Sequence, residues 1–162
     1  MALMEHDMNK IREEALKELA RRNYIDYFYY ANNCTFVPLR HQRYIAPYLQ
    51  RISDGERLFI IVELPPQHGK STFITESIPS YYLMKNPDKL AMVVSYSEEL
   101  YKKFGRKNRE KFRTFSKELF DLEISSDTAS VSEWGIDKHL GQLYSTSILG
   151  GATGRGSNLL II

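Results

Sequence analysis

A short run of residues with the chemistry to bind phosphate lies near the middle of the chain: Pro65-Pro66-Gln67-His68-Gly69-Lys70-Ser71-Thr72. It follows an apolar stretch, Leu58–Leu64, which is typical of a strand buried in a parallel sheet, and it opens a stretch of helical composition. Phosphate binding needs backbone N–H groups at a helix N-terminus and a glycine that lets the backbone approach the anion. In such a loop Lys70 would reach the β- and γ-phosphates, and the Ser71 hydroxyl would help to hold Mg²⁺.

The match to the full phosphate-loop pattern is incomplete. The pattern G-x-x-x-x-G-K-[ST] requires glycine at position 64, where this chain has leucine, so only Gly69-Lys70-Ser71 fits strictly. An ordinary strand-to-helix turn is the alternative, and the apolar run before the loop favours phosphate binding over it. The glycine-rich segment 150–156 has the wrong spacing for a dinucleotide fingerprint and leads into a strand, which argues against a dehydrogenase.

The elements that would position this loop alternate between strands and helices. Helical spacing predicts helices over about 8–22, 41–52 and 98–120, and over 71–84 with a bend or break caused by Pro79. Apolar runs predict strands at 58–64, 90–96 and 159–162, and a more polar strand at 143–148. The alternation predicts an α/β fold with a mostly parallel sheet flanked by helices, behind an N-terminal helical segment.

Composition limits the class of protein. The chain has 162 residues, of which 43% are hydrophobic and 26% charged, and its net charge of +2 is close to neutral. These values fit one globular domain rather than a disordered or polycationic tail. A single cysteine, Cys34, excludes an intramolecular disulfide and a cysteine-rich zinc module, and no apolar run is long enough to span a membrane. We therefore expect a soluble intracellular protein.

Positive charge is concentrated in one part of the chain. The segment Lys85–Lys117 holds ten basic residues against four acidic ones. Lys103, Lys107 and Lys111 follow one another at intervals of four in the predicted helix 98–120, and such a row can engage DNA phosphates without sequence preference. A solvated outer helix face or a subunit contact is the alternative. The aromatic residues in and after this helix are expected to pack in the core: Phe104, Phe112, Phe115, Trp134 and Tyr144.

A glutamine upstream of the loop is a second candidate for nucleotide contact. Gln42 stands in the run Leu39-Arg40-His41-Gln42-Arg43, after a turn at Pro38. Its amide offers one kind of donor and one acceptor, which is what the edge of an adenine base requires. An exposed glutamine that contacts only solvent is the alternative.

Taken in order, these motifs resemble the large terminase subunit of tailed bacteriophages, the ATPase that drives DNA into the procapsid. The resemblance covers roughly residues 36–162. It rests on Pro38–Arg43, on Leu64–Ser71, on Val93–Ser97 with Leu100 and Phe104-Gly105-Arg106, and on Gly151–Gly156 before Leu159–Ile162.

The resemblance implies a phosphate-loop NTPase fold of the RecA-like (ASCE) type that uses ATP and Mg²⁺. Gln42 would contact adenine, and Gln67, His68, Gly69, Lys70, Ser71 and Thr72 would bind the phosphates. Lys70 would be catalytic, and so would Arg155, which in similar motors can reach the nucleotide of a neighbouring subunit; a solvated cation or a DNA contact is the alternative for Arg155. The implied partners are double-stranded DNA, the portal protein, the small terminase subunit and other copies in a ring, in the cytoplasm of the bacterial host.

The chain departs from the family pattern in two places. Gln67 stands where many relatives have arginine, and the acidic pair that completes the metal site, together with the nuclease domain, would follow Ile162. We therefore expect an entry segment at 1–37 and a partial ATPase domain at 38–162 that binds nucleotide but hydrolyses it poorly or not at all. A fragment of another RecA-like ATPase, such as a DEAD-box-like helicase, is one alternative. A non-catalytic remnant that serves in assembly or DNA binding is another.

Overall fold

The computed structural model describes residues 2–150 and 155–162, with side chains from residue 7 onward. The chain divides into two compact units, Met1–Gln50 and Arg51–Ile162. The glycines of the 151–154 motif lie outside the described residues.

The first unit is helical. It contains α1 (Ala2–Arg22), α2 (Tyr24–Ala31) and most of α3 (Arg40–Ser53), so the aromatic segment after the first helix is itself a helix. Tyr24, Tyr27 and Phe28 of α2 are fully buried. The Tyr24 backbone N–H donates to the Gln50 side-chain Oε1 at 2.6 Å, which ties the start of α2 to α3.

The second unit is built on a five-stranded sheet. The strands are β1 (Leu90–Ser95), β2 (Ile124–Ala129), β3 (Glu133–Ile136), β4 (Gln142–Ser147) and β5 (Leu159–Ile161), in the order β2-β3-β4-β1-β5. The strand β1 is parallel to both β4 and β5, whereas β3 is antiparallel to both β2 and β4. The α/β class and three of the expected strands are confirmed, but the sheet is mixed rather than mostly parallel.

The expected strand Leu58–Leu64 is wrong. This segment forms no strand, and the side chains of Phe59 and Ile61 are 94% and 90% exposed. Both edges of β1 are occupied, by β4 on one side and by β5 on the other. An apolar run shows a preference for burial but does not specify a pairing partner, and here strands from later in the chain flank β1.

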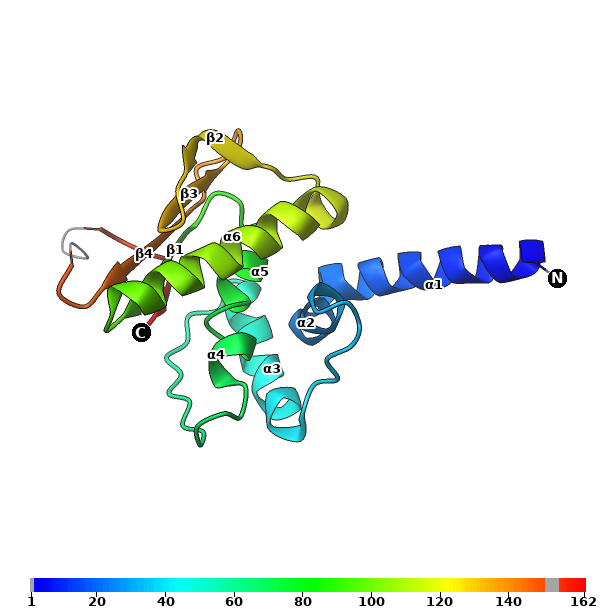
Figure 1. Ribbon diagram of the computed structural model, residues 1–162, viewed down its shortest axis with the longest axis horizontal. Coiled ribbons are helices and arrows are strands. Elements are labelled where there is room, and N and C mark those ends of the chain that lie inside the picture. The colour runs from blue at the N-terminus through cyan, green and yellow to red at the C-terminus, as the bar shows by residue number, and fades with distance from the viewer. Residues whose placement is uncertain (1, 151–154) are drawn as a thin grey trace. The chain divides into compact units, whose positions relative to one another are not determined.

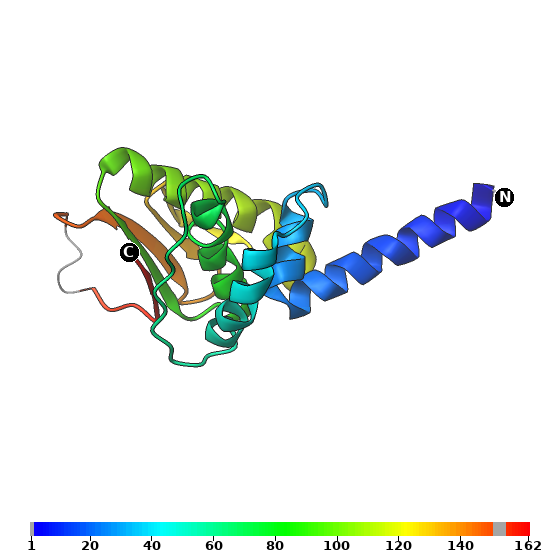
Figure 2. The same cartoon turned by 90° about the horizontal axis from the view of Figure 1, so that it is seen from below.

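The helices of the second unit are α4 (Lys70–Phe73), α5 (Ile78–Lys85) and α6 (Glu98–Phe120). The expected break in the 71–84 helix is confirmed, but it lies before Pro79, which sits in the first turn of α5, where a proline is tolerated. Helix α6 has the predicted bounds, and the Ser97 side chain caps it by accepting from the Leu100 N–H at 3.3 Å. Figures 1 and 2 show α6 lying over the sheet, and it packs against α5, β1 and β4.

The core of the second unit lies between α6 and the sheet. Phe112 and Trp134 are both fully buried, and their ring centroids are 5.0 Å apart. Phe104 is buried on the same helix. These three aromatic residues are therefore core anchors, as the sequence predicted.

A glycine allows α6 to approach the chain next to β3. A Cβ atom added at Gly105 would lie 2.1 Å from the Val131 carbonyl oxygen and 2.9 Å from the Ser145 hydroxyl. The side of α6 that carries Gly105 is therefore in backbone contact with the sheet layer.

Replacing this glycine should destabilise the fold. Because the added methyl group meets a backbone oxygen, Gly105→Ala should lower the free energy of unfolding by about 1–3 kcal/mol despite the better helix propensity of alanine. Urea unfolding followed by circular dichroism measures the change. Gly156→Ala is the matched control, since a Cβ there meets nothing within 4 Å. Equal stability of the two variants would contradict the close approach of α6.

Candidate nucleotide site

The Gly-Lys-Ser loop makes a tight turn into α4. Gln67 and Gly69 have positive φ angles of 63° and 73°, and Gly69 is the N-cap residue of the helix in the left-handed conformation. Glycine adopts this conformation at little cost, whereas glutamine does so with some strain. The His68 ring Nδ1 lies 2.9 Å from the Pro66 carbonyl oxygen. The loop backbone thus reverses direction immediately before Lys70.

The backbone N–H groups of Gly69–Thr72 donate to no backbone carbonyl in the described part of the chain, and no side chain there caps the helix. The first amide after them, that of Phe73, donates to the Gly69 carbonyl at 2.9 Å. Lys70 and Ser71 are exposed. The loop therefore carries several N–H donors without a backbone acceptor, one exposed ammonium group and one exposed hydroxyl, which are the kinds of donor that phosphate requires.

The residues fit Mg²⁺ only in the company of a ligand that supplies oxygens. Ser71 contributes one exposed hydroxyl, and among the described residues no group of three or more His, Cys, Asp or Glu side chains could hold a metal ion. Mg²⁺ keeps several waters and takes substrate phosphate oxygens, so one protein hydroxyl is compatible with it.

Gln42 is buried rather than exposed. Its side chain is 1% exposed, and its Oε1 accepts from the Leu39 N–H at 2.9 Å, which caps the start of α3. The Nε2 group is buried without an acceptor among the described residues. Gln42 belongs to the first unit and the phosphate loop to the second, so adenine contact stays a prediction.

The three lysines of the expected basic row have different surroundings. Lys103 Nζ lies 3.1 Å from Glu76 Oε1, and Lys107 Nζ lies 3.7 Å from Glu110 Oε2; both lysine side chains are about half exposed. Lys111 is mostly buried and donates to the Ser77 hydroxyl. Burial lowers the pKa of Lys111 to about 8, although the charge of Glu76 acts in the opposite direction. Lys111 thus belongs to the interior, beside the helix pair α4 and α5.

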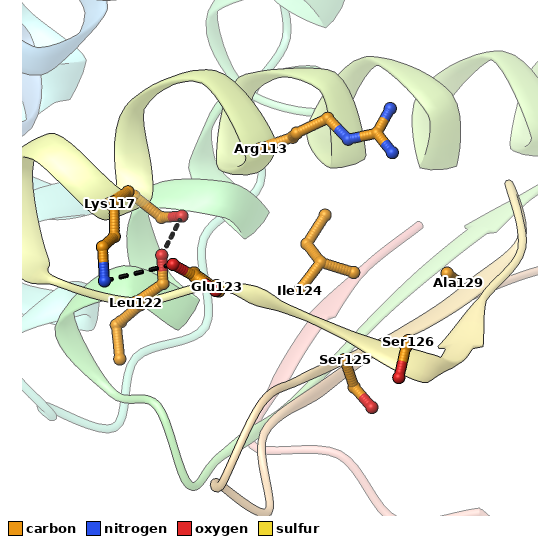
Figure 3. Close-up of a pocket in the computed structure, with 9 residues that line it drawn as sticks. Arg113, Lys117, Leu122, Glu123, Ile124, Ser125, Ser126 and Ala129 are labelled. Atoms are coloured by element: carbon orange, nitrogen blue, oxygen red, sulfur yellow. Dashed lines mark hydrogen bonds and ion pairs between the residues drawn. The ribbon is translucent and has the colours of Figure 1, made fainter.

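Two exposed arginines on α6 were not predicted from the sequence as DNA contacts. Arg106 and Arg113 lie seven residues apart, close to two helical turns, and within the described part of the chain neither forms an ion pair. Arg113 and Lys117 border a pocket between α6 and β2, opposite Glu123 and Ile124 (Figure 3), and Lys117 Nζ lies 3.1 Å from Glu123 Oε1 there. The seven-residue spacing of Arg106 and Arg113 was the signal in the sequence that could have identified them.

Arg155 is held against the sheet. Its guanidinium lies 3.0 Å from Glu133 Oε1 and 4.1 Å from the centroid of the Tyr144 ring. Gln142 Nε2 donates to the same glutamate oxygen at 3.0 Å. The Arg155 side chain is 47% exposed. Its role at a neighbouring subunit stays a prediction.

The second unit is an α/β domain with a mixed sheet, in which a Gly-Lys-Ser loop with unbonded amides opens a short helix. Residues 61–162 match the family model for the terminase large subunit, T4likevirus-type, N-terminal. This match covers more than half of the chain, so the chain belongs to that family, and the resemblance to terminase ATPases is confirmed. No match was found among curated proteins or among solved structures. Among the described residues, no helix combines the length and apolar character needed to cross a membrane.

The low pKa of Lys111 predicts a particular dependence of stability on pH. Between about pH 8, its folded value, and pH 10.5, its ordinary value, the unfolded chain binds more protons at this site than the folded chain does. Below pH 8 the folded chain therefore bears the full free-energy cost of burying the Lys111 charge. This cost decreases as the pH rises, because the buried lysine loses its proton. The free energy of unfolding should increase between pH 8 and 10 relative to that of Lys111→Met.

Urea unfolding at pH 7, 8, 9 and 10 measures this difference. The exposed Lys89 provides the control, since Lys89→Met should run parallel to the unaltered chain. Parallel curves for Lys111→Met and the unaltered chain would contradict a buried, charged Lys111.

Proposed function

We propose that the Pro65–Thr72 loop binds the triphosphate of ATP, and that the chain is the ATP-binding part of a phage DNA-packaging motor. The unbonded amides of Gly69–Thr72 beside an exposed Lys70 are the observation that supports this proposal most directly. The amides would hold the β-phosphate region, and the Lys70 ammonium would neutralise charge on the γ-phosphoryl group as it is transferred. Mg²⁺, when bound, would neutralise phosphate charge, and the Ser71 hydroxyl is the group of this chain that would hold it.

Membership of the terminase family connects this site to DNA. A motor of this kind would act on double-stranded DNA, in a ring of copies, with a portal protein and a small terminase subunit as partners. Gln42 would contact adenine. Arg155 would stabilise phosphoryl charge on a neighbouring copy, after exchanging Glu133 for the phosphate. The family match favours this interpretation over a helicase fragment.

The exposed cations of α6 are proposed as the DNA-contacting face. Arg106 and Arg113 are exposed and form no ion pair among the described residues, so they are available to phosphates. Lys103 and Lys107 are half exposed and would have to exchange Glu76 and Glu110 for phosphate, whereas Lys111 is directed into the fold. Contacts of this kind give affinity without sequence preference, as translocation along DNA requires.

Removing the ammonium of residue 70 should abolish the charge-assisted part of nucleotide binding. In a calorimetric titration with Mg·ATP, Lys70→Ala should weaken binding at least tenfold, which corresponds to about 1.4 kcal/mol. Lys89→Ala removes an exposed lysine away from the loop and should bind as the unaltered chain does. If the folded, unaltered chain binds no nucleotide, the proposal fails and a non-catalytic remnant is the better interpretation.

The DNA face is tested by the salt dependence of binding. The double variant Arg106→Ala/Arg113→Ala should weaken binding to a double-stranded DNA fragment and reduce the slope of log K against log [salt] by about 1 for each DNA phosphate that an arginine no longer neutralises. Fluorescence anisotropy at four salt concentrations measures both quantities. Lys117→Ala is the control, because Lys117 is already paired with Asp121 and Glu123. An unchanged slope would place the DNA elsewhere.

A further inference from the structure

The chain that joins α4 to α5 contains buried polar residues. Glu76 is 7% exposed, and Ser77 is fully buried. Backbone and side-chain polar groups in such a place must find partners inside the protein. Some of the partners of this junction lie in the same segment, and others come from α6.

Asn108 supplies two of these hydrogen bonds. Its side chain is fully buried; Oδ1 accepts from the Ser80 N–H at 3.0 Å, and Nδ2 donates to the Thr75 carbonyl at 2.8 Å. Nδ2 also donates to the Phe104 carbonyl of its own helix at 2.9 Å. One amide group therefore holds the junction on both sides, at Thr75 and at the first turn of α5.

Lys111 reaches the same junction one helical turn later. Its ammonium donates to the Ser77 hydroxyl, and that hydroxyl donates in turn to the Thr72 carbonyl at 2.7 Å. Thr72 belongs to α4 and lies at the end of the run of unbonded amides. A continuous path of hydrogen bonds thus runs from α6 to the loop helix.

Glu76 binds the carbonyl of Ser71, the residue before Thr72. Its backbone N–H donates to the Ser71 carbonyl at 2.8 Å, while its carboxylate pairs with Lys103 of α6 at 3.1 Å. The carbonyls of two successive loop-helix residues, Ser71 and Thr72, are therefore fixed by the junction. Because a peptide group is planar, these carbonyls set the direction of the Thr72 and Phe73 amides, of which the Thr72 amide belongs to the unbonded run.

The helix α4 has only four residues, and a helix of that length is not stable by itself in water. We propose that Asn108 and Lys111 are positioning residues of the nucleotide site: through Thr75, Ser77 and Ser80 they hold the carbonyl side of α4, so that the amides of Gly69–Thr72 keep the arrangement that phosphate needs. The identity of the ligand rests on the proposed function, whereas the effect on the loop backbone does not.

Three variants test this proposal: Ser77→Ala removes the bridging hydroxyl, Lys111→Met removes its donor, and Asn108→Ala removes the amide. Ser116→Ala is the matched control, because Ser116 is also buried on α6 and its hydroxyl donates to the Leu122 carbonyl at 2.7 Å, far along the helix from the loop. Urea unfolding identifies conditions in which every variant is folded. If Asn108→Ala does not fold, the other two variants carry the test.

Two measurements are made under those conditions. Hydrogen exchange of the segment 69–77 in the nucleotide-free chain should be about tenfold faster in the three variants than in Ser116→Ala. Affinity should fall about tenfold both for Mg·ATP and for inorganic triphosphate, because the loss concerns the phosphate cradle and not the base. A purely structural role would slow or speed exchange throughout the unit instead.

The outcomes separate this proposal from the proposed function. Unchanged exchange and affinity in the folded variants, or equal losses in Ser116→Ala, would overturn the positioning role while Lys70 keeps its own. If the unaltered chain binds neither ligand, the proposed function fails, and hydrogen exchange alone decides. Faster exchange confined to 69–77 would then support positioning of the loop, and exchange equal to that of Ser116→Ala would refute it.

Discussion

The proposed nucleotide site depends on one constraint: a four-residue helix must keep its amides unbonded on one side while its carbonyls are held on the other. A helix of four residues does not keep its conformation by itself in water. Helix α6 holds it in place, since Gly105 and Phe112 fix α6 to the sheet layer, and Asn108 fixes the α4–α5 junction to α6. In the proposed arrangement, the core therefore positions the loop through α6.

The positively charged residues of α6 have two different kinds of surroundings. Burying the Lys111 ammonium costs desolvation energy, which the nearby Glu76 charge offsets in part. Lys111 therefore serves an internal hydrogen bond, whereas Arg106 and Arg113 remain at the surface. The composition of the segment gives only the number of cations. Their burial in the structure shows which of them stabilise the fold and which of them a ligand can reach.

The sequence predicted the parts of this site that depend on local pattern. The bounds of α6 and the strands β1, β4 and β5 followed from the residue pattern of each segment, and the break between α4 and α5 was expected from Pro79. Lys111 turns inward, away from the other two lysines of the row, because a helix advances about 100° per residue and Lys111 lies about 80° around the axis from Lys103. The strand expected at 58–64 is absent, and the strands β2 and β3 were not expected, because pairing partners decide which segments enter a sheet and composition does not encode them.

Burial also separates the fixed parts of the site from those that can move. Asn108 and Ser77 are fully buried, so leaving their partners would strand polar groups without water, at a cost of about 1–3 kcal/mol for each group. Arg155 is half exposed, and an exposed ion pair such as that with Glu133 contributes only about 0–1 kcal/mol. A triphosphate carries more negative charge than one carboxylate and can therefore compete for Arg155. The hydrogen bonds from α6 thus suit a permanent scaffold, and the contact between Arg155 and Glu133 suits a group that changes partners.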